Sequence, residues 1–368
     1  MKQRILITGG QGYLGSLLSG LLVQENFDVT TIDTGFFIKS LCGNIQILKQ
    51  EGLREICQDT RDVSLDDLKG YDSVIHLAGI SNDPMGKMNA NDVYGPTRIY
   101  AIRLARMCKE VGARFIFASS CSVYGIGGSE LLNEESQAIP QTGYSQNKLD
   151  IEKDLQDLSD ASFSPIALRF ATVYGPSPRI RFDVVVNMLA GMAVSQKRIV
   201  LNSDGLSWRP NLHIYDLCES IRCCLEWDYQ EGRLMVLNVG QEEDNCTVMD
   251  LVQKVKKAVP DAEVKFLNQN PALDQQGLIR DRKVEGSDTR TYRVSFEKIR
   301  KILPSFKCKW SLDKGIPHLV KWLQSRELTE KEFLDRKFYR LQQLEKLLEN
   351  GDLTKELRWT KRPDNLKI

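Results

Sequence analysis

Tyr144 and Lys148 are the two residues of this chain whose types and spacing could carry proton chemistry. They stand four positions apart in GYSQNKLD, so on a helix they share one face, one turn from each other. A free phenol has a pKa of about 10, and a neighbouring ammonium stabilises the phenolate and lowers that pKa. The pair could therefore act as acid and base on an alcohol or a carbonyl. The spacing alone is weak evidence for catalysis, because most pairs with this spacing are solvent-facing helix residues.

The stretch ASSCSVYG, residues 118–125, supplies hydroxyls that such a tyrosine could work with. Ser120 ends the apolar run RFIFASS, and it could hold the reacting oxygen of a substrate opposite Tyr144. Cys121 beside it could be read as a nucleophile. No histidine stands near it in the sequence to activate a thiol, so a buried structural cysteine is the favoured interpretation.

A glycine-rich turn, TGGQGYLG, follows the first apolar run and opens a helical pattern. Its spacing, Gly10-x-Gly12-x-x-Gly15 overlapping Gly9-x-x-Gly12, suits a tight turn, close approach of backbone to a pyrophosphate, and a helix N-terminus facing phosphate. Asp33 ends a second expected strand, 18 residues after Gly15. A carboxylate there can accept the ribose hydroxyls of NAD and repels a 2′-phosphate, so the sequence predicts NAD rather than NADP.

The elements expected around these residues alternate between strands and helices. Strands are expected at 4–9, 28–33, 72–79, 114–120 and 164–175, and helices at 14–24, 97–111 and 144–158. This order predicts an α/β fold, a Rossmann-type doubly wound parallel sheet with a smaller C-terminal α/β lobe. We expect an NAD-binding domain at 1–175, a substrate lobe at 176–325 that partly returns to the first domain, and a helical tail at 326–368. The stretch EKEFLDRKFYRLQQLEKLLEN predicts one amphipathic helix, packed on the body or on a partner.

Composition excludes several classes of partner. Fifty Lys+Arg against forty-nine Asp+Glu give a net charge of +1, which offers no reason to expect nucleic acid or an anionic membrane. The chain has no long apolar run and its start does not read as a signal peptide. Nine cysteines without C-x-x-C spacing favour free thiols in a reducing cytosol over disulfides or a metal site. We therefore expect a cytoplasmic protein with no metal.

Taken together, TGGQGYLG, HLAG at 76–79, SSCSVYG at 119–125 and YSQNK at 144–148 resemble the extended short-chain dehydrogenase/reductases, in the nucleotide-sugar epimerase/dehydratase branch. The match covers about residues 1 to 325 and leaves out the tail. The resemblance implies that Ser120, Tyr144 and Lys148 are catalytic. It implies a cofactor site that also uses Gly9, Gly12, Tyr13, Leu14, Gly15, Asp33, Asp59, Thr60, Leu77 and Ala78.

The resemblance also implies residues for a nucleotide-diphosphate sugar. Arg209 in RPNLHIYD aligns with the arginine that binds the diphosphate, and Arg290 is a weaker second candidate. A guanidinium can bind phosphate oxygens bidentately, although a surface ion pair is the alternative for Arg209. Phe182, Asp183 and Asn187 are expected to line the sugar pocket, with Asn187 contacting substrate. His213 is expected to be structural.

The sequence departs from the family pattern at two places, and the first of them limits which reactions of the family are expected. The 4,6-dehydratases of this family carry an Asp–Glu pair after the catalytic Ser/Thr, whereas this chain has Cys121 and Ser122. A thiol and a hydroxyl are not matched in pKa to the proton transfers of that elimination, which argues against dehydration. Asp92 stands where the family usually has Asn.

Three functions remain open at this point. The first is an NAD-dependent epimerase that transiently oxidises C4 of a nucleotide-diphosphate hexose. The second is a one-way 4-keto-sugar reductase or C4 dehydrogenase with the same site, and the third is a catalytically silent dinucleotide sensor. The resemblance further implies a homodimer, formed through the helices at 97–111 and 144–158.

Overall fold

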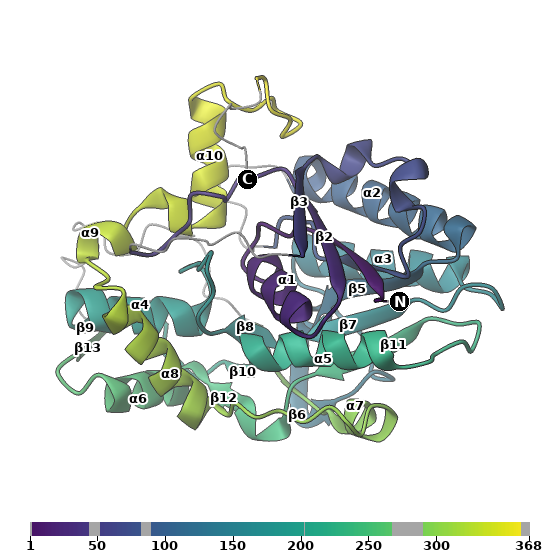
Figure 1. Cartoon of the computed structure of the whole chain (residues 1–368). Coiled ribbons are helices and arrows are strands. Elements are labelled where there is room, and N and C mark those ends of the chain that lie inside the picture. Colours follow the sequence, from purple (N-terminus) through teal and green to yellow (C-terminus); the bar gives the residue numbers. More distant parts are fainter. Residues whose placement is uncertain (1, 44–51, 82–89, 202, 267–289, 362–368) are drawn as a thin grey trace.

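The computed structural model describes residues 2–43, 52–81, 90–201, 203–266 and 290–361, with only the backbone described at 90–92 and 129. Within these residues the main sheet has seven parallel strands, in the order β3-β2-β1-β4-β5-β7-β11 (Figure 1). Its strands are β1 (Arg4–Thr8), β2 (Asp28–Asp33), β3 (Leu53–Cys57), β4 (Ser73–His76), β5 (Arg114–Ser120), β7 (Ile166–Phe170) and β11 (Met235–Val239). The order runs outward from β1 in both directions, so the predicted doubly wound α/β fold is confirmed.

The central strands are buried along most of their length because helices cover both faces of a parallel sheet. All residues of β4 and β7 are buried. The expected strand at 164–175 divides after β7, which corrects the prediction. The backbone of Ala171 still bonds Val239 O of the main sheet, and the next residues form β8 (Thr172–Tyr174), which pairs with β10 (Trp208–His213) in a separate sheet.

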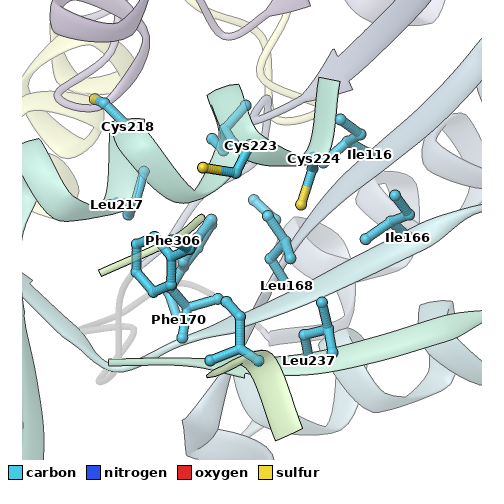
Figure 2. Packing of buried hydrophobic residues seen from close by; sticks show 14 of the residues in the cluster. Ile116, Ile166, Leu168, Phe170, Leu217, Cys218, Cys223, Cys224, Leu237 and Phe306 are labelled. Carbon is cyan, nitrogen blue, oxygen red and sulfur yellow. The ribbon is translucent and has the colours of Figure 1, made fainter. Parts of the chain in front are cut away.

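Helices cover both faces of the sheet (Figure 1). Helices α1 (Gly15–Gln24) and α5 (Ile214–Glu226) share one apolar core, while α2 (Ala90–Val111) and α3 (Gly143–Leu158) share the other. Figure 2 shows Cys223 and Cys224 of α5 among the apolar side chains of the first core. All nine cysteines lie in the described part of the chain and are free thiols, most of them buried.

The chain beyond β8 forms a second group of elements with its own core. Its helices are α4 (Val185–Gln196), α6 (Val248–Ala258) and α8 (Leu312–Ser325), whereas α7 (Glu297–Ile302) packs on the core of the main sheet. Short strand pairs join β9 (Arg198–Leu201) to β13 (Glu263–Phe266), β12 (Asn245–Thr247) to β10, and β14 (Thr291–Val294) to β6 (Ile126–Leu132). Strand β11 and helix α5 return from this part of the chain to the main sheet.

The C-terminal segment, residues 326–361, is not the single helix that its periodicity predicts. It forms α9 (Glu330–Phe333), a 3₁₀ turn at Arg336–Phe338 and α10 (Arg340–Glu349). The break occurs because Phe333 and Phe338 both pack on Phe182, and the Phe182 backbone donates to Phe338 O at 3.0 Å. The Asp335 side chain caps the 3₁₀ turn. The segment packs on the body of the same chain, with α10 close to the end of the main sheet near β2 and β3 (Figure 1).

Candidate active site

Helix α3 places Tyr144 and Lys148 on one face. A capping box between Thr142 and Ser145 starts the helix, which puts Tyr144 in its first turn. Lys148 Nζ lies 5.7 Å from the centre of the Tyr144 ring, donates to Ala118 O at 2.6 Å and stands over the Phe117 ring. Burial lowers the pKa of Lys148 to about 8. At pH values below that pKa, Lys148 is protonated and places a positive charge near the Tyr144 phenol.

Ser120 ends β5, and its hydroxyl accepts a hydrogen bond from the Ser122 backbone at 3.1 Å. It is half-buried at the carboxyl end of the sheet, whereas Cys121 turns into the core and donates to Arg169 O at 3.1 Å. Burial raises the pKa of the Cys121 thiol, so the thiolate is disfavoured. This geometry supports the structural interpretation of Cys121 over the nucleophilic one.

A buried ion pair, which sequence reasoning missed, lies one turn beyond Lys148. Arg169 Nη2 lies 2.6 Å from Glu152 Oε2, and Ser119 donates to the same carboxylate. Arg169 also donates to the Tyr124 hydroxyl at 2.9 Å. The network joins α3 to β5 and β7, so it holds the helix that carries the tyrosine. Its signal in the sequence was the four-residue spacing from Lys148 to Glu152.

The glycine turn packs closely against neighbouring backbone, which leaves no room for side chains at two of its positions. Gly9 has a φ of +81°, and a Cβ there would stand 2.7 Å from Ala78 N. A Cβ on Gly15 would collide with Gly9 O. Leu14 precedes α1 without a side-chain cap, and Gly12 N donates to Gly9 O at 3.1 Å. A helix N-terminus without a side-chain cap, beside a backbone that can be approached closely, fits the pyrophosphate of a dinucleotide.

Asp33 stands beside this turn, as predicted from its place at the end of β2. Its carboxylate accepts from Gln11 N at 3.0 Å and from Gly35 N at 2.7 Å. A carboxylate can accept further bonds, so ribose hydroxyls remain compatible with these two. Burial raises the pKa of Asp33, and the two backbone donors and nearby arginines oppose that rise.

The other predicted cofactor residues lie along the same edge of the sheet. Leu77 and Ala78 follow β4, and Leu77 N donates to Thr8 O at 3.0 Å. Thr60 is buried in the short turn that Asp59 caps. The Asp59 carboxylate is paired with Arg61 at 2.6 Å and lies 3.6 Å from Arg358 of the C-terminal segment. Tyr13 points away from solvent and donates to Gly175 O at 2.8 Å.

The predicted diphosphate residues lie in the second group of elements. Arg209 is 8% exposed, so it is buried rather than on the surface. Its guanidinium donates to Trp208 O at 2.8 Å and to Arg290 O, which brings the two predicted arginines side by side. His213 is buried and stacks on Trp310 with ring centres 4.7 Å apart, which is a structural role.

The residues expected to line the sugar pocket are buried in protein contacts. Phe182 is 0% exposed and belongs to the core with α9, so the expectation of a pocket-lining role is corrected. Asp183 is paired with Arg181. Asn187 is also 0% exposed, and its amide binds Gly175 N, the Tyr13 hydroxyl and Arg181 O. These bonds hold the strand end after β8 against the glycine turn, and its contact with substrate stays a prediction. Asp92 lies in α2, where its side chain is outside the described residues.

Sequence reasoning also missed three arginines, Arg179, Arg181 and Arg340, which the fold gathers near Asp33 and Asp183. The motif PRIRFD after Tyr174-Gly175 signals the first two. Arg340 has no local signal, because its place depends on the fold of the C-terminal segment.

No group of three or more His, Cys, Asp or Glu side chains is arranged to hold a metal ion among the residues described. Across the same residues, every helix is too short or too polar to cross a membrane.

Comparison with known proteins identifies the family of this chain. Residues 5–240 match the model of the NAD dependent epimerase/dehydratase family, and the chain belongs to this family. It is 29% identical over 262 residues to an uncharacterised UDP-glucose epimerase, YtcB, of Bacillus subtilis, covering 68% of this chain and 82% of that protein. It is 24% identical to a UDP-glucuronic acid decarboxylase of Arabidopsis thaliana, covering 86% and 91%.

Among solved structures, the fold is similar to a UDP-glucuronic acid 4-epimerase from Bacillus cereus in complex with UDP-glucuronic acid and NAD. The TM-score is 0.73 at 24% identity, covering 88% of this chain and 99% of that one. Membership of the family confirms that this chain is an NAD-dependent enzyme of the nucleotide-sugar class. Its glycine turn and Asp33 fit that cofactor.

Proposed function

We propose that this chain inverts C4 of a nucleotide-diphosphate hexose by transient oxidation, with Ser120, Tyr144 and Lys148 as its catalytic residues. The observation that carries the proposal is the Lys148 ammonium 5.7 Å from the Tyr144 ring, at the cofactor end of the sheet. NAD, when bound, would take up and return the hydride. The same site would serve a one-way reductase or C4 dehydrogenase, which consumes cofactor.

Each residue has one task in this reaction. The Tyr144 phenolate removes the proton of the C4 hydroxyl and returns it to the ketone oxygen after the sugar has presented its other face. The Lys148 ammonium stabilises that phenolate, and the Ser120 hydroxyl donates a hydrogen bond to the same sugar oxygen. Arg209, with Arg290 beside it, binds the diphosphate of the substrate. The buried Cys121 leaves no acid pair for loss of water, so we exclude 4,6-dehydration from the proposal.

The proposal is tested by incubating the protein with NAD and UDP-, GDP-, CDP- and dTDP-hexoses and their 4-keto forms, followed by NMR of the products. The expected result is a C4 epimer formed without net change in NAD. Net NADH formation or consumption would favour the dehydrogenase or the reductase. Binding of NAD without turnover of any of these sugars would favour the silent sensor.

We also propose a homodimer formed through α2 and α3 in the cytoplasm. Ile99 of α2 is 72% exposed, which is unusual for a large apolar side chain, and an Arg98–Asp154 pair at 2.6 Å fixes α2 against α3. Light scattering at micromolar concentration should give twice the mass of the chain. The Ile99→Lys variant should give the mass of a single chain.

A further inference from the structure

The C-terminal segment lies close to the edge of the sheet where the cofactor residues were predicted. In the sequence it lies outside residues 5–240, which match the family model. Trp359 Nε1 donates to Thr34 O at 2.8 Å, directly after Asp33. Arg61 Nη2 donates to Leu357 O at 2.7 Å, and Arg358 lies 3.6 Å from Asp59. The segment therefore contacts the Asp59 carboxylate and the residue that follows Asp33, at the two places that were predicted to face the adenosine half of NAD.

An apolar cluster anchors α10 in this place. Leu344 and Leu347 of α10 are buried with Val93 and Tyr94 of α2. Side chains from around the cofactor edge pack on the same cluster, namely Phe36, Phe37, Ile80 and Tyr144. The segment thus contacts residues near both ends of the predicted cofactor site, and Arg340 is the first residue of α10.

Arg340 carries a buried guanidinium, 4% exposed as a residue. Nη1 donates to Ser40 Oγ and Nη2 to Arg179 O, each at 3.2 Å, and the group lies 4.5 Å from the Phe37 ring centre. Among the described residues, no carboxylate lies within 4 Å of it. Its own backbone N–H donates to Asp183, which is already paired with Arg181.

Arg179 lies next to Arg340 and, within the described part of the chain, is also a buried arginine without an ion pair. It is 4% exposed, and its Nε has no hydrogen-bond partner among the described residues. Its backbone donates to Ser177 Oγ at 3.3 Å, and that hydroxyl donates to Tyr13 O of the glycine turn at 2.7 Å. The carboxylates of Asp33 and Glu55 are near enough to act on the charge of Arg179 without an ion pair.

Two buried cations without paired anions are costly to fold, and a bound anion would offset that cost. Burial and the neighbouring Arg181 lower the pKa of Arg340 to about 9, while Asp33 and Asp183 oppose the change. The charges of Arg179 and Arg340 act on Asp33, and Arg340 also feels Arg181, whose charge in turn interacts with Tyr144. A dinucleotide running from Asp33 to Tyr144 has its pyrophosphate between these ends.

We propose that Arg340 and Arg179 bind the pyrophosphate of NAD, so that the C-terminal segment completes the cofactor site. The proposal rests on the cofactor of the family and does not depend on which sugar is epimerised. A nucleotide sugar also carries a diphosphate. The link from Arg179 through Ser177 to Tyr13 of the glycine turn favours the cofactor.

The test compares ligands that differ in the pyrophosphate. Affinities of the full chain for ADP-ribose, adenosine and UDP are measured by calorimetry for the native protein and for Arg340→Gln, Arg340→Lys and Arg179→Gln. Arg336→Gln is the matched control, because Arg336 belongs to the same segment but pairs with Glu349 at 2.8 Å. Circular dichroism and adenosine binding report whether each variant keeps its fold.

We expect Arg340→Gln and Arg179→Gln to weaken ADP-ribose about 10- to 100-fold, with adenosine and UDP changed less than about threefold. Arg340→Lys should fall between the native protein and Arg340→Gln, and Arg336→Gln should match the native protein. Equal losses for ADP-ribose and adenosine would overturn the proposal in favour of a structural role. A selective loss for UDP would assign the pair to the substrate instead. Should Arg340→Gln fail to fold, the ADP-ribose to adenosine ratio of Arg179→Gln decides alone.

Discussion

The two ends of the proposed cofactor site are held in different ways. At the catalytic end, Tyr144, Lys148 and Glu152 follow one another at helical spacing on α3, so their arrangement is local. At the other end, the C-terminal segment meets the cleft through contacts such as Arg340 to Arg179 O, 161 residues apart in sequence. The catalytic residues can therefore be recognised from a short sequence motif. The residues that would enclose the cofactor come together only in the complete fold.

The largest effect is expected at the catalytic end, where turnover should depend on Tyr144. Tyr144→Phe removes the only atom of that side chain that can transfer a proton, so turnover should fall about 10²- to 10⁴-fold with NAD affinity unchanged. Initial rates by NMR and calorimetry with NAD measure both quantities. Tyr71→Phe is the control, because Tyr71 lies against Arg4 at the amino end of β1. Equal rates for Tyr144→Phe and the native protein would refute the catalytic assignment.

Phe338→Ala tests how the C-terminal segment is held. Phe338 is 0% exposed between Phe182 and the lobe, so the truncation should lower the free energy of unfolding by about 3–5 kcal/mol, measured by urea. Amide exchange should rise first in residues 330–361 while β4 and β5 stay protected. Leu348→Ala, a half-buried position on α10, should cost about 1 kcal/mol. An unchanged unfolding free energy for Phe338→Ala would contradict the packing described.

Lys148 should titrate apart from the other lysines in the protein without cofactor. Because burial lowers its pKa to about 8, the ammonium is present below that pH and is lost as the pH rises through it. NMR of ¹³C-labelled lysine side chains should show one resonance with a midpoint near pH 8, absent in Lys148→Met. A common midpoint above about 10 for all lysines would show that burial does not shift this group.

The smallest effect is expected at the surface of the segment. Arg358 lies 2.5 Å from Asp62, and its side chain is 38% exposed. Such pairs contribute little in water, so Arg358→Gln should change the free energy of unfolding by about 1 kcal/mol or less, and less again at high salt. Urea unfolding at two salt concentrations checks this. A loss comparable to that of Phe338→Ala would mean that charge pairs, rather than aromatic packing, hold the segment.

The same contrast explains what the sequence could predict. The bounds of β2 and β5 match the expected ranges, because each is a short run rich in β-branched or aromatic residues. Helix α3 begins one residue before the expected start, at its capping box. The break between α9 and α10 could not be read, because Phe333 and Phe338 insert into a lobe distant in sequence. The burial of Asn187 and Phe182 was missed for the same reason.

The central claim is that C4 of the sugar is oxidised and reduced again within one active site. It is tested most directly with a nucleotide-diphosphate hexose carrying deuterium at C4, incubated with the native protein and NAD in ordinary water. The account predicts the C4 epimer with its deuterium retained, because the hydride that leaves C4 returns to it. An epimer that has lost the deuterium to solvent, or label that accumulates in free NADH, would contradict it.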